Sequence, residues 1–125
     1  MTEARRAPDK VRDVACVLLS VALLLFARRY DGPGSTFLHQ HGANLSFSFG
    51  AFYILRLLRV PRSGRAWITA LLALAGVWLQ EGLQAAGLYP GVFDPLDLLY
   101  DAGGVVLAWA LCVATSRVRT SSLSR

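Results

Sequence analysis

Residues 66–116 read AWITALLALAGVWLQEGLQAAGLYPGVFDPLDLLYDAGGVVLAWALCVATS, and this stretch decides the fold. It contains two apolar runs, 66–86 and 96–116. Between them Tyr89, Pro90 and Gly91 interrupt the helical pattern, because Pro and Gly end helices and open turns. As a helix rising 1.5 Å per residue, each run would be about 30 Å long, the thickness of the hydrocarbon core of a bilayer. The stretch therefore predicts two transmembrane helices joined by a short loop.

Two further apolar runs precede this stretch, at residues 12–29 and 42–60. No small-residue cleavage site follows the first run, which favours an uncleaved span over a signal peptide. The second run is interrupted by Asn44, Ser46, Ser48 and Arg56, so that a helix lying in the membrane interface is the alternative to a span.

The composition agrees with a membrane protein. Hydrophobic residues make up 54% of the 125 residues and charged residues 17%, and the mean hydropathy is +0.45. A small soluble helical bundle is the alternative, but a chain of this size has too much surface for so apolar a composition. We predict an all-α, polytopic membrane protein with four transmembrane helices in a single domain, residues 1–125.

The basic residues predict the orientation of the four spans. Four lie before or at the start of the first run, four lie near the end of the second run or between it and the third, and three follow the fourth, whereas Arg28 and Arg29 lie at the opposite end of the first run. The three groups are Arg5, Arg6, Lys10 and Arg12; Arg56, Arg59, Arg62 and Arg65; and Arg117, Arg119 and Arg125. The positive-inside rule then makes both termini cytoplasmic, in a multi-pass protein of the inner (cytoplasmic) membrane. The arginines form no basic face and match no recognition motif, which excludes nucleic acid as the expected partner.

Two other features carry expectations about packing and order. Cys16 and Cys112 fall within apolar runs with no metal ligands nearby in the sequence, so we expect both to be small buried hydrophobes. The C-terminal tail, TSSLSR, is short and polar, and we expect it to be disordered.

Carboxylates gather at the predicted outer ends of the last two helices. Asp94, Asp97 and Asp101 have i, i+3, i+7 spacing, which puts them on one helical face. Glu81 lies at a similar depth in the preceding helix. Because carboxylates are costly in hydrocarbon, we expect these groups to face one another and to line an outward-facing polar pocket. The candidate binding residues are Asn44, Glu81, Gln84, Asp94, Asp97 and Asp101. For Asp94 and Asp97, a helix cap and a first-turn acid in the headgroup region is the alternative.

At these residues the chain resembles the VanZ-like family of small bacterial membrane proteins, named for a member linked to teicoplanin resistance. Glu81-Gly-Leu-Gln84 resembles the family's Glu-x-x-Gln element, and Phe93-Asp94-Pro-Leu-Asp97 resembles its Phe-Asp and Asp element, with Asp101 where the family usually has Asn. Asn44-Leu-Ser-Phe-Ser-Phe-Gly50 is similar to its second-span segment. The resemblance covers about residues 42–115. It implies a four-helix protein of the cell envelope, with glycopeptide resistance as one special case of its role.

The sequence leaves three functions open. The one we favour is non-enzymatic binding of a polar or lipid-linked envelope ligand, because no nucleophile–base pair is legible and no cofactor motif is present. The second is a metal-dependent membrane enzyme, in which His39 and His41 would meet Asp94 and Asp97. Two His residues in a Gly-rich loop are more often solvated than metal-bound, so no metal site is predicted there.

The third function is an ion- or proton-coupled carrier that uses the cluster of Glu81, Asp97 and Asp101. Four spans are few for a carrier without oligomerisation, though a homodimer could supply the transport path. The lipid bilayer is the one partner common to all three readings.

Overall fold

The structure is a computed structural model that describes residues 7–124, and it is all-helical over those residues. The elements in chain order are α1 (Ala7–Arg29), α2 (Ser35–Phe37), a π-helical turn η1 (Leu38–Gly42), α3 (Ala43–Leu57), α4 (Ala66–Ala85) and α5 (Pro95–Leu123). The four long helices coincide with the four apolar runs, so the all-α prediction is confirmed. Arg5, Arg6 and Arg125, three of the basic residues used above, lie outside the described residues.

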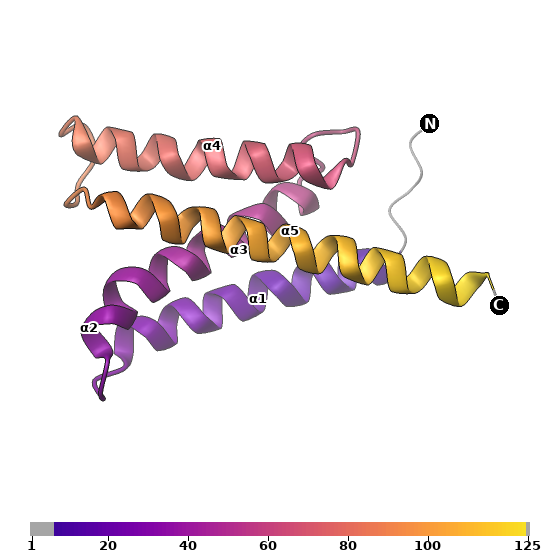
Figure 1. Ribbon diagram of the computed structural model, residues 1–125, viewed down its shortest axis with the longest axis horizontal. Helices are drawn as coiled ribbons and strands as arrows, with labels where there is room; N and C mark the ends of the chain where they lie inside the picture. Colours follow the sequence, from indigo (N-terminus) through magenta and orange to yellow (C-terminus); the bar gives the residue numbers. More distant parts are fainter. Residues whose placement is uncertain (1–6, 125) are drawn as a thin grey trace.

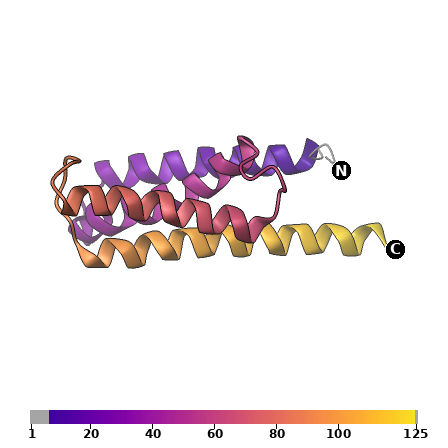
Figure 2. The ribbon, with the colours of Figure 1, turned by 90° about the horizontal axis from the view of Figure 1, so that it is seen from above.

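The four long helices alternate in direction. Figure 1 shows that α1 begins, α3 ends, α4 begins and α5 ends at one end of the bundle, and Figure 2 shows the same from a second side. The segments 30–42 and 86–94 lie at the opposite end. α3 is the central helix, because it packs against α1, α4 and α5.

Two of these helices, α4 and α5, are long and apolar enough to cross a membrane. α3 has 15 residues, about 22 Å of helix, and includes Arg56. α1 is longer, with 23 residues, but charged residues occupy both of its ends. The membrane character of the chain is thus carried most strongly by α4 and α5.

The helix bounds correct the expected runs at two places. The second run was expected to extend to residue 60, but α3 ends at Leu57 because Arg59 adopts a left-handed conformation, with φ 58°, and Pro61 follows. The tail was expected to be disordered, but α5 continues to Leu123. The hydroxyls of its Ser and Thr residues donate to carbonyls three or four residues earlier, so their hydrogen bonds are made within the helix.

Small and polar side chains fill much of the space between the helices. Phe52 and Tyr53 of α3 are the largest fully buried residues of the core, and the Tyr53 hydroxyl donates to the Ala108 carbonyl of α5 over 2.9 Å. Cys16 and Cys112 belong to the same core, as expected from their apolar surroundings. Many large apolar side chains face outwards instead, among them Leu18, Leu71, Leu79, Leu99 and Val106. This distribution suits a bundle whose outer surface meets lipid.

One glycine sets the contact between α3 and α5. A Cβ at Gly104 would overlap the Ser48 hydroxyl and the backbone oxygen of Leu45, so only Gly fits there. The neighbouring Gly103 lies about 100° further round α5, where a Cβ would meet nothing within 4 Å. Close helix approach therefore depends on Gly104 and not on Gly103.

Replacing Gly104 by Ala is expected to destabilise the protein by about 1–3 kcal/mol, because the added methyl must push α3 and α5 apart. Gly103→Ala is the matched control. It should be neutral, or stabilising by up to about 1 kcal/mol, since Ala favours the helix more than Gly does. Thermal unfolding in mild detergent compares the two variants, and equal midpoints would contradict the α3–α5 contact described here.

Candidate functional site

The start of α5 places three aspartates at increasing depth. Asp94 is the N-cap, and its carboxylate accepts a hydrogen bond from the backbone N–H of Leu96 over 3.0 Å, with Pro95 in the first turn. Asp97 follows one turn later with 14% of its side chain exposed. Asp101, a further turn along the same face, is only 2% exposed. The carboxylates thus pass from the surface into the bundle.

Glu81 of α4 lies in the same neighbourhood. It is 5% exposed, and its charge interacts with those of Asp97, Asp94 and Asp101 across the α4–α5 interface. The indole N–H of Trp78 donates to the Leu98 carbonyl over 3.1 Å and ties the two helices together at this level. One carboxylate oxygen of Glu81, Oε2, is buried without a hydrogen-bond partner among the described residues.

His41 joins the cluster from the π-helical turn before α3. Its Nδ1 lies 3.5 Å from Oδ1 of Asp97, and its imidazole stacks on the Tyr100 ring with centroids 4.4 Å apart and planes 19° apart. Phe37 meets both rings edge-on. π-helical turns occur frequently at functional sites, because they redirect one side chain without ending the helix. Here His41 is turned towards Asp97.

Three other residues were candidates from the sequence: Gln84, Asn44 and His39. Their side chains form no hydrogen bond or ion pair with this cluster in the described chain. The Gln84 side chain donates to the Pro90 carbonyl over 3.3 Å and so fastens the loop between α4 and α5. Asn44 is half-buried in the first turn of α3, and no side-chain hydrogen bond joins it to another of residues 7–124. His39 is exposed, with Nε2 2.8 Å from the Tyr30 carbonyl, so it does not accompany His41. No group of three metal-ligating side chains occurs within residues 7–124.

Sequence reasoning missed Tyr100 and ranked His41 only as a weak metal candidate. Tyr100 follows Asp97 by three residues and therefore shares its face of α5, which is the signal that was available. Nothing in the local sequence near His41 indicated its pairing with α5, because the contact joins residues 56 positions apart.

The acidic cluster, defined as Glu81, Asp94, Asp97 and Asp101, has an unbalanced charge. Within residues 7–124, no Lys or Arg forms an ion pair with any of its members, and His41 is their one basic contact. A buried carboxylate requires a positive charge or a hydrogen-bond donor, since burial removes the water that otherwise solvates it. The cluster can therefore receive a cation, a proton or a donor-rich group.

The acidic cluster is packed between helices. Four cavities lined by described residues have volumes of about 630, 450, 290 and 230 Å³, and none of the four is lined by a member of the cluster. The cavity of about 450 Å³ lies between α1, α3 and α4 and is lined mainly by apolar side chains. The largest of the four lies at the opposite, arginine-rich end of the bundle, as does the cavity of about 290 Å³.

A comparison of this chain with protein-family models, with curated proteins and with solved structures finds no match.

Substitutions at Asp101 test whether the cluster depends on shape or on charge. Asp101→Asn keeps the shape and removes repulsion with Glu81 and Asp97, so it should be neutral or stabilising. Asp101→Leu leaves the Glu81 carboxylate beside an apolar group and should cost about 1–3 kcal/mol. Thermal unfolding in detergent measures both. Asp94→Asn is the control and should be close to neutral, because Asn caps a helix as well as Asp does.

A double-mutant cycle extends this test. Glu81→Ala should destabilise less in the Asp101→Leu background than in the natural sequence, because partners in one network are not additive. If Asp101→Asn proved as damaging as Asp101→Leu, the negative charge itself would be required, and a carrier or metal function would gain over binding.

Proposed function

We propose that this protein is an integral membrane protein with four spans and cytoplasmic termini, which binds a polar or lipid-linked ligand of the cell envelope through its acidic cluster. The ligand contributes positive charge or hydrogen-bond donors, such as an amino group. The protein acts by binding and does not catalyse a reaction.

The alternating helices and the distribution of arginines support the topology. The basic segment 58–65 lies at the same end as the start of α1 and the end of α5 (Figure 1), and the acidic cluster lies near the other end. Such a charge difference orients membrane proteins with the basic end in the cytoplasm. The short α3 is surrounded by the other three long helices, so it needs less apolar surface than a helix in contact with lipid.

One observation carries the ligand proposal: Glu81 and Asp101 are 5% and 2% exposed without a Lys or Arg partner in the described chain. Charged groups at membrane depth are costly, and they occur mainly where they bind a ligand or conduct ions. The more exposed Asp97, together with His41, would meet the ligand first. The resemblance of segments 81–84 and 93–97 to the VanZ-like family agrees with an envelope role.

An ion- or proton-coupled carrier is the second candidate, favoured by the near-complete burial of the two carboxylates. Proton flux into liposomes that depends on Glu81 would select the carrier over the binding protein.

The topology is tested by labelling introduced cysteines with a membrane-impermeant thiol reagent in intact cells. Val92→Cys, at a position that is 89% exposed, should react from outside, and Ser63→Cys should react only after permeabilisation. The unmodified protein is the control, since Cys16 and Cys112 are buried and should stay unlabelled. Reaction of Ser63→Cys in intact cells would contradict the orientation and would favour an interfacial α3.

The ligand is sought by native mass spectrometry of the protein purified in mild detergent. A bound species is expected on the natural protein, and Glu81→Gln or Asp97→Asn should lower its occupancy about tenfold or more, because each change removes a charged partner. Asp31→Asn, at an exposed aspartate of the same end that lies outside the acidic cluster, is the control and should leave the occupancy unchanged. A bound mass whose occupancy changed with neither Glu81→Gln nor Asp97→Asn would contradict binding at the acidic cluster.

A further inference from the structure

A second charged cluster lies at the arginine-rich end of the bundle. Asp13 of α1 is fully buried, and its Oδ1 accepts two hydrogen bonds from the Arg12 guanidinium, over 3.0 and 2.8 Å. Its Oδ2 lies 3.6 Å from Nε of Arg56 at the end of α3. Asp9 pairs with Arg12 and with Arg119 of α5. Among residues 7–124, three guanidinium groups therefore share two carboxylates in this cluster.

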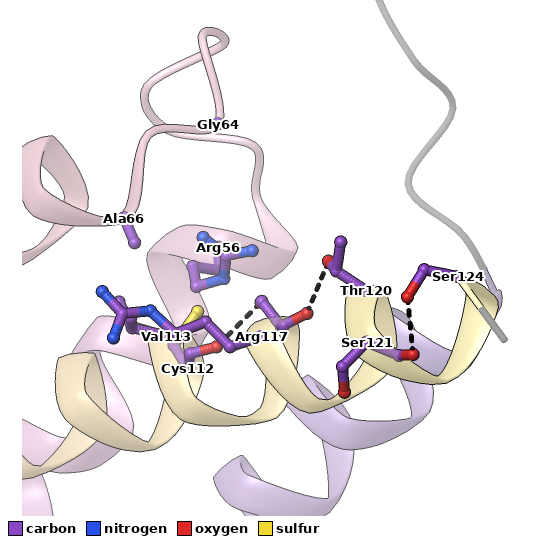
Figure 3. Close-up of a pocket in the computed structure, with 10 residues that line it drawn as sticks. Arg56, Gly64, Ala66, Cys112, Val113, Arg117, Thr120, Ser121 and Ser124 are labelled. Carbon is purple, nitrogen blue, oxygen red and sulfur yellow. Dashed lines mark hydrogen bonds between the residues drawn. The ribbon is translucent and has the colours of Figure 1, made fainter.

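A cavity of about 630 Å³ lies beside this cluster, between α5 and the end of the segment that joins α3 to α4. Ten described residues line it, and Arg56 and Arg117 are the charged ones among them, without an Asp or Glu. Figure 3 shows Arg56 between the end of α3 and α5, with Arg117 extending along α5 towards Ala66. The cavity is thus positive on two sides.

The donors available in this cavity are those of the arginines. The hydroxyls of Ser116, Thr120, Ser121 and Ser124 already donate to carbonyls of α5, over 2.8, 3.0, 2.8 and 3.0 Å. Arg56 is 9% exposed, and its Nε has no hydrogen-bond partner, since the distance to Asp13 is that of an ion pair only. Arg12 also donates to Asp13, so two guanidinium groups share that carboxylate among the described residues. An anion in the cavity would supply further negative charge to Arg56.

The position of the cavity along the bundle indicates which anions can reach it. Ala66, the first residue of α4, is one of its lining residues, and Trp67 beside it is half-exposed, as is typical of a side chain at a membrane interface. The cavity therefore lies where the apolar part of α4 begins, at the level of lipid headgroups. Guanidinium forks match the oxygens of phosphate in geometry and charge.

We propose that this cavity, formed around Arg56 and Arg117, binds a phosphate group, supplied by the headgroup of an anionic lipid or by a soluble phosphate compound. The inference rests on the membrane placement proposed above, but it involves no residue of the acidic cluster. If no polar ligand were found at the acidic cluster, the proposal of a phosphate site would therefore still stand.

The test measures the unfolding midpoint of the full chain in mild detergent during titration with dioleoyl phosphatidylglycerol, zwitterionic dioleoyl phosphatidylcholine, or inorganic phosphate against chloride at equal ionic strength. A ligand that binds only the folded state raises the midpoint in a saturable way. Phosphatidylglycerol alone raising the midpoint identifies the lipid headgroup as the source. An equal response to inorganic phosphate identifies the phosphate group itself.

Arg117→Gln is the informative variant, because Arg117 is exposed and forms no ion pair within residues 7–124, so the variant should fold as the natural protein does. It should weaken the response to the active ligand about fivefold. Arg29→Gln, an exposed arginine at the other end, is the matched control and should leave the response unchanged. Arg56→Lys keeps the charge but removes the fork, and should also weaken the response.

Two outcomes would overturn the proposal. One is the absence of a saturable midpoint shift with phosphatidylglycerol and with phosphate. The other is an equal loss of the midpoint shift in Arg29→Gln and Arg117→Gln. That result would mean that the shift depends on the net charge of the protein and not on this cavity. The labelling of Ser63→Cys reports separately on the membrane placement, so the two failures are distinguishable.

Discussion

A carboxylate buried between helices must be matched by a positive charge or a hydrogen-bond donor, and this constraint acts at both ends of the bundle. At the arginine-rich end the chain satisfies it internally, because Arg12 and Arg56 converge on Asp13 from α1 and α3. At the other end Glu81 and Asp101 are also buried, but no Lys or Arg of the described chain forms an ion pair with them. The same physical requirement is thus met by an arginine at one end and is not met by one at the other, and this difference is the basis of the proposed ligand site.

The central position of α3 explains why the second apolar run is the least apolar of the four. Its Ser46 and Ser48 are buried against other helices, where small side chains permit close approach and a hydroxyl can return its hydrogen bond to the helix, as Ser48 does to the Leu45 carbonyl. Gly104 of α5 faces this small surface. A helix surrounded by protein does not require the hydrophobic face that lipid contact demands. Hydropathy alone therefore underestimates the tendency of this run to form a helix of the bundle.

The sequence predicted those features that repeat along one helix. The four helices followed from apolar runs, and the depth order of Asp94, Asp97 and Asp101 followed from their spacing on α5. Features that join separate helices were not predictable in this way. The stacking of His41 on Tyr100 and the pairing of Arg56 with Asp13 depend on how α1, α3 and α5 cross, and periodicity within one segment carries no information about crossing. Periodicity also could not predict the partner of Gln84. It lies on the same face of α4 as Glu81, but its side chain donates to the Pro90 carbonyl of the following loop and not to a carboxylate.

The two proposed sites have opposite charge, and both include residues of α5. The distance between them limits how strongly binding at one site can change the affinity of the other. Asp101 and Arg117 are sixteen residues apart on one helix, about 24 Å at the rise of an α-helix. Two unit charges at that distance interact by about 0.7 kcal/mol at an effective dielectric constant of 20, which corresponds to about a threefold change in affinity. Any larger coupling would require α5 to shift along α3. Gly104 opposes such a shift, because its backbone lies against the Leu45 carbonyl and the Ser48 hydroxyl with no room for a Cβ. With α5 held in this way, a phosphate at one end and a donor-rich ligand at the other would each stabilise the same arrangement of helices, and each would bind almost independently of the other.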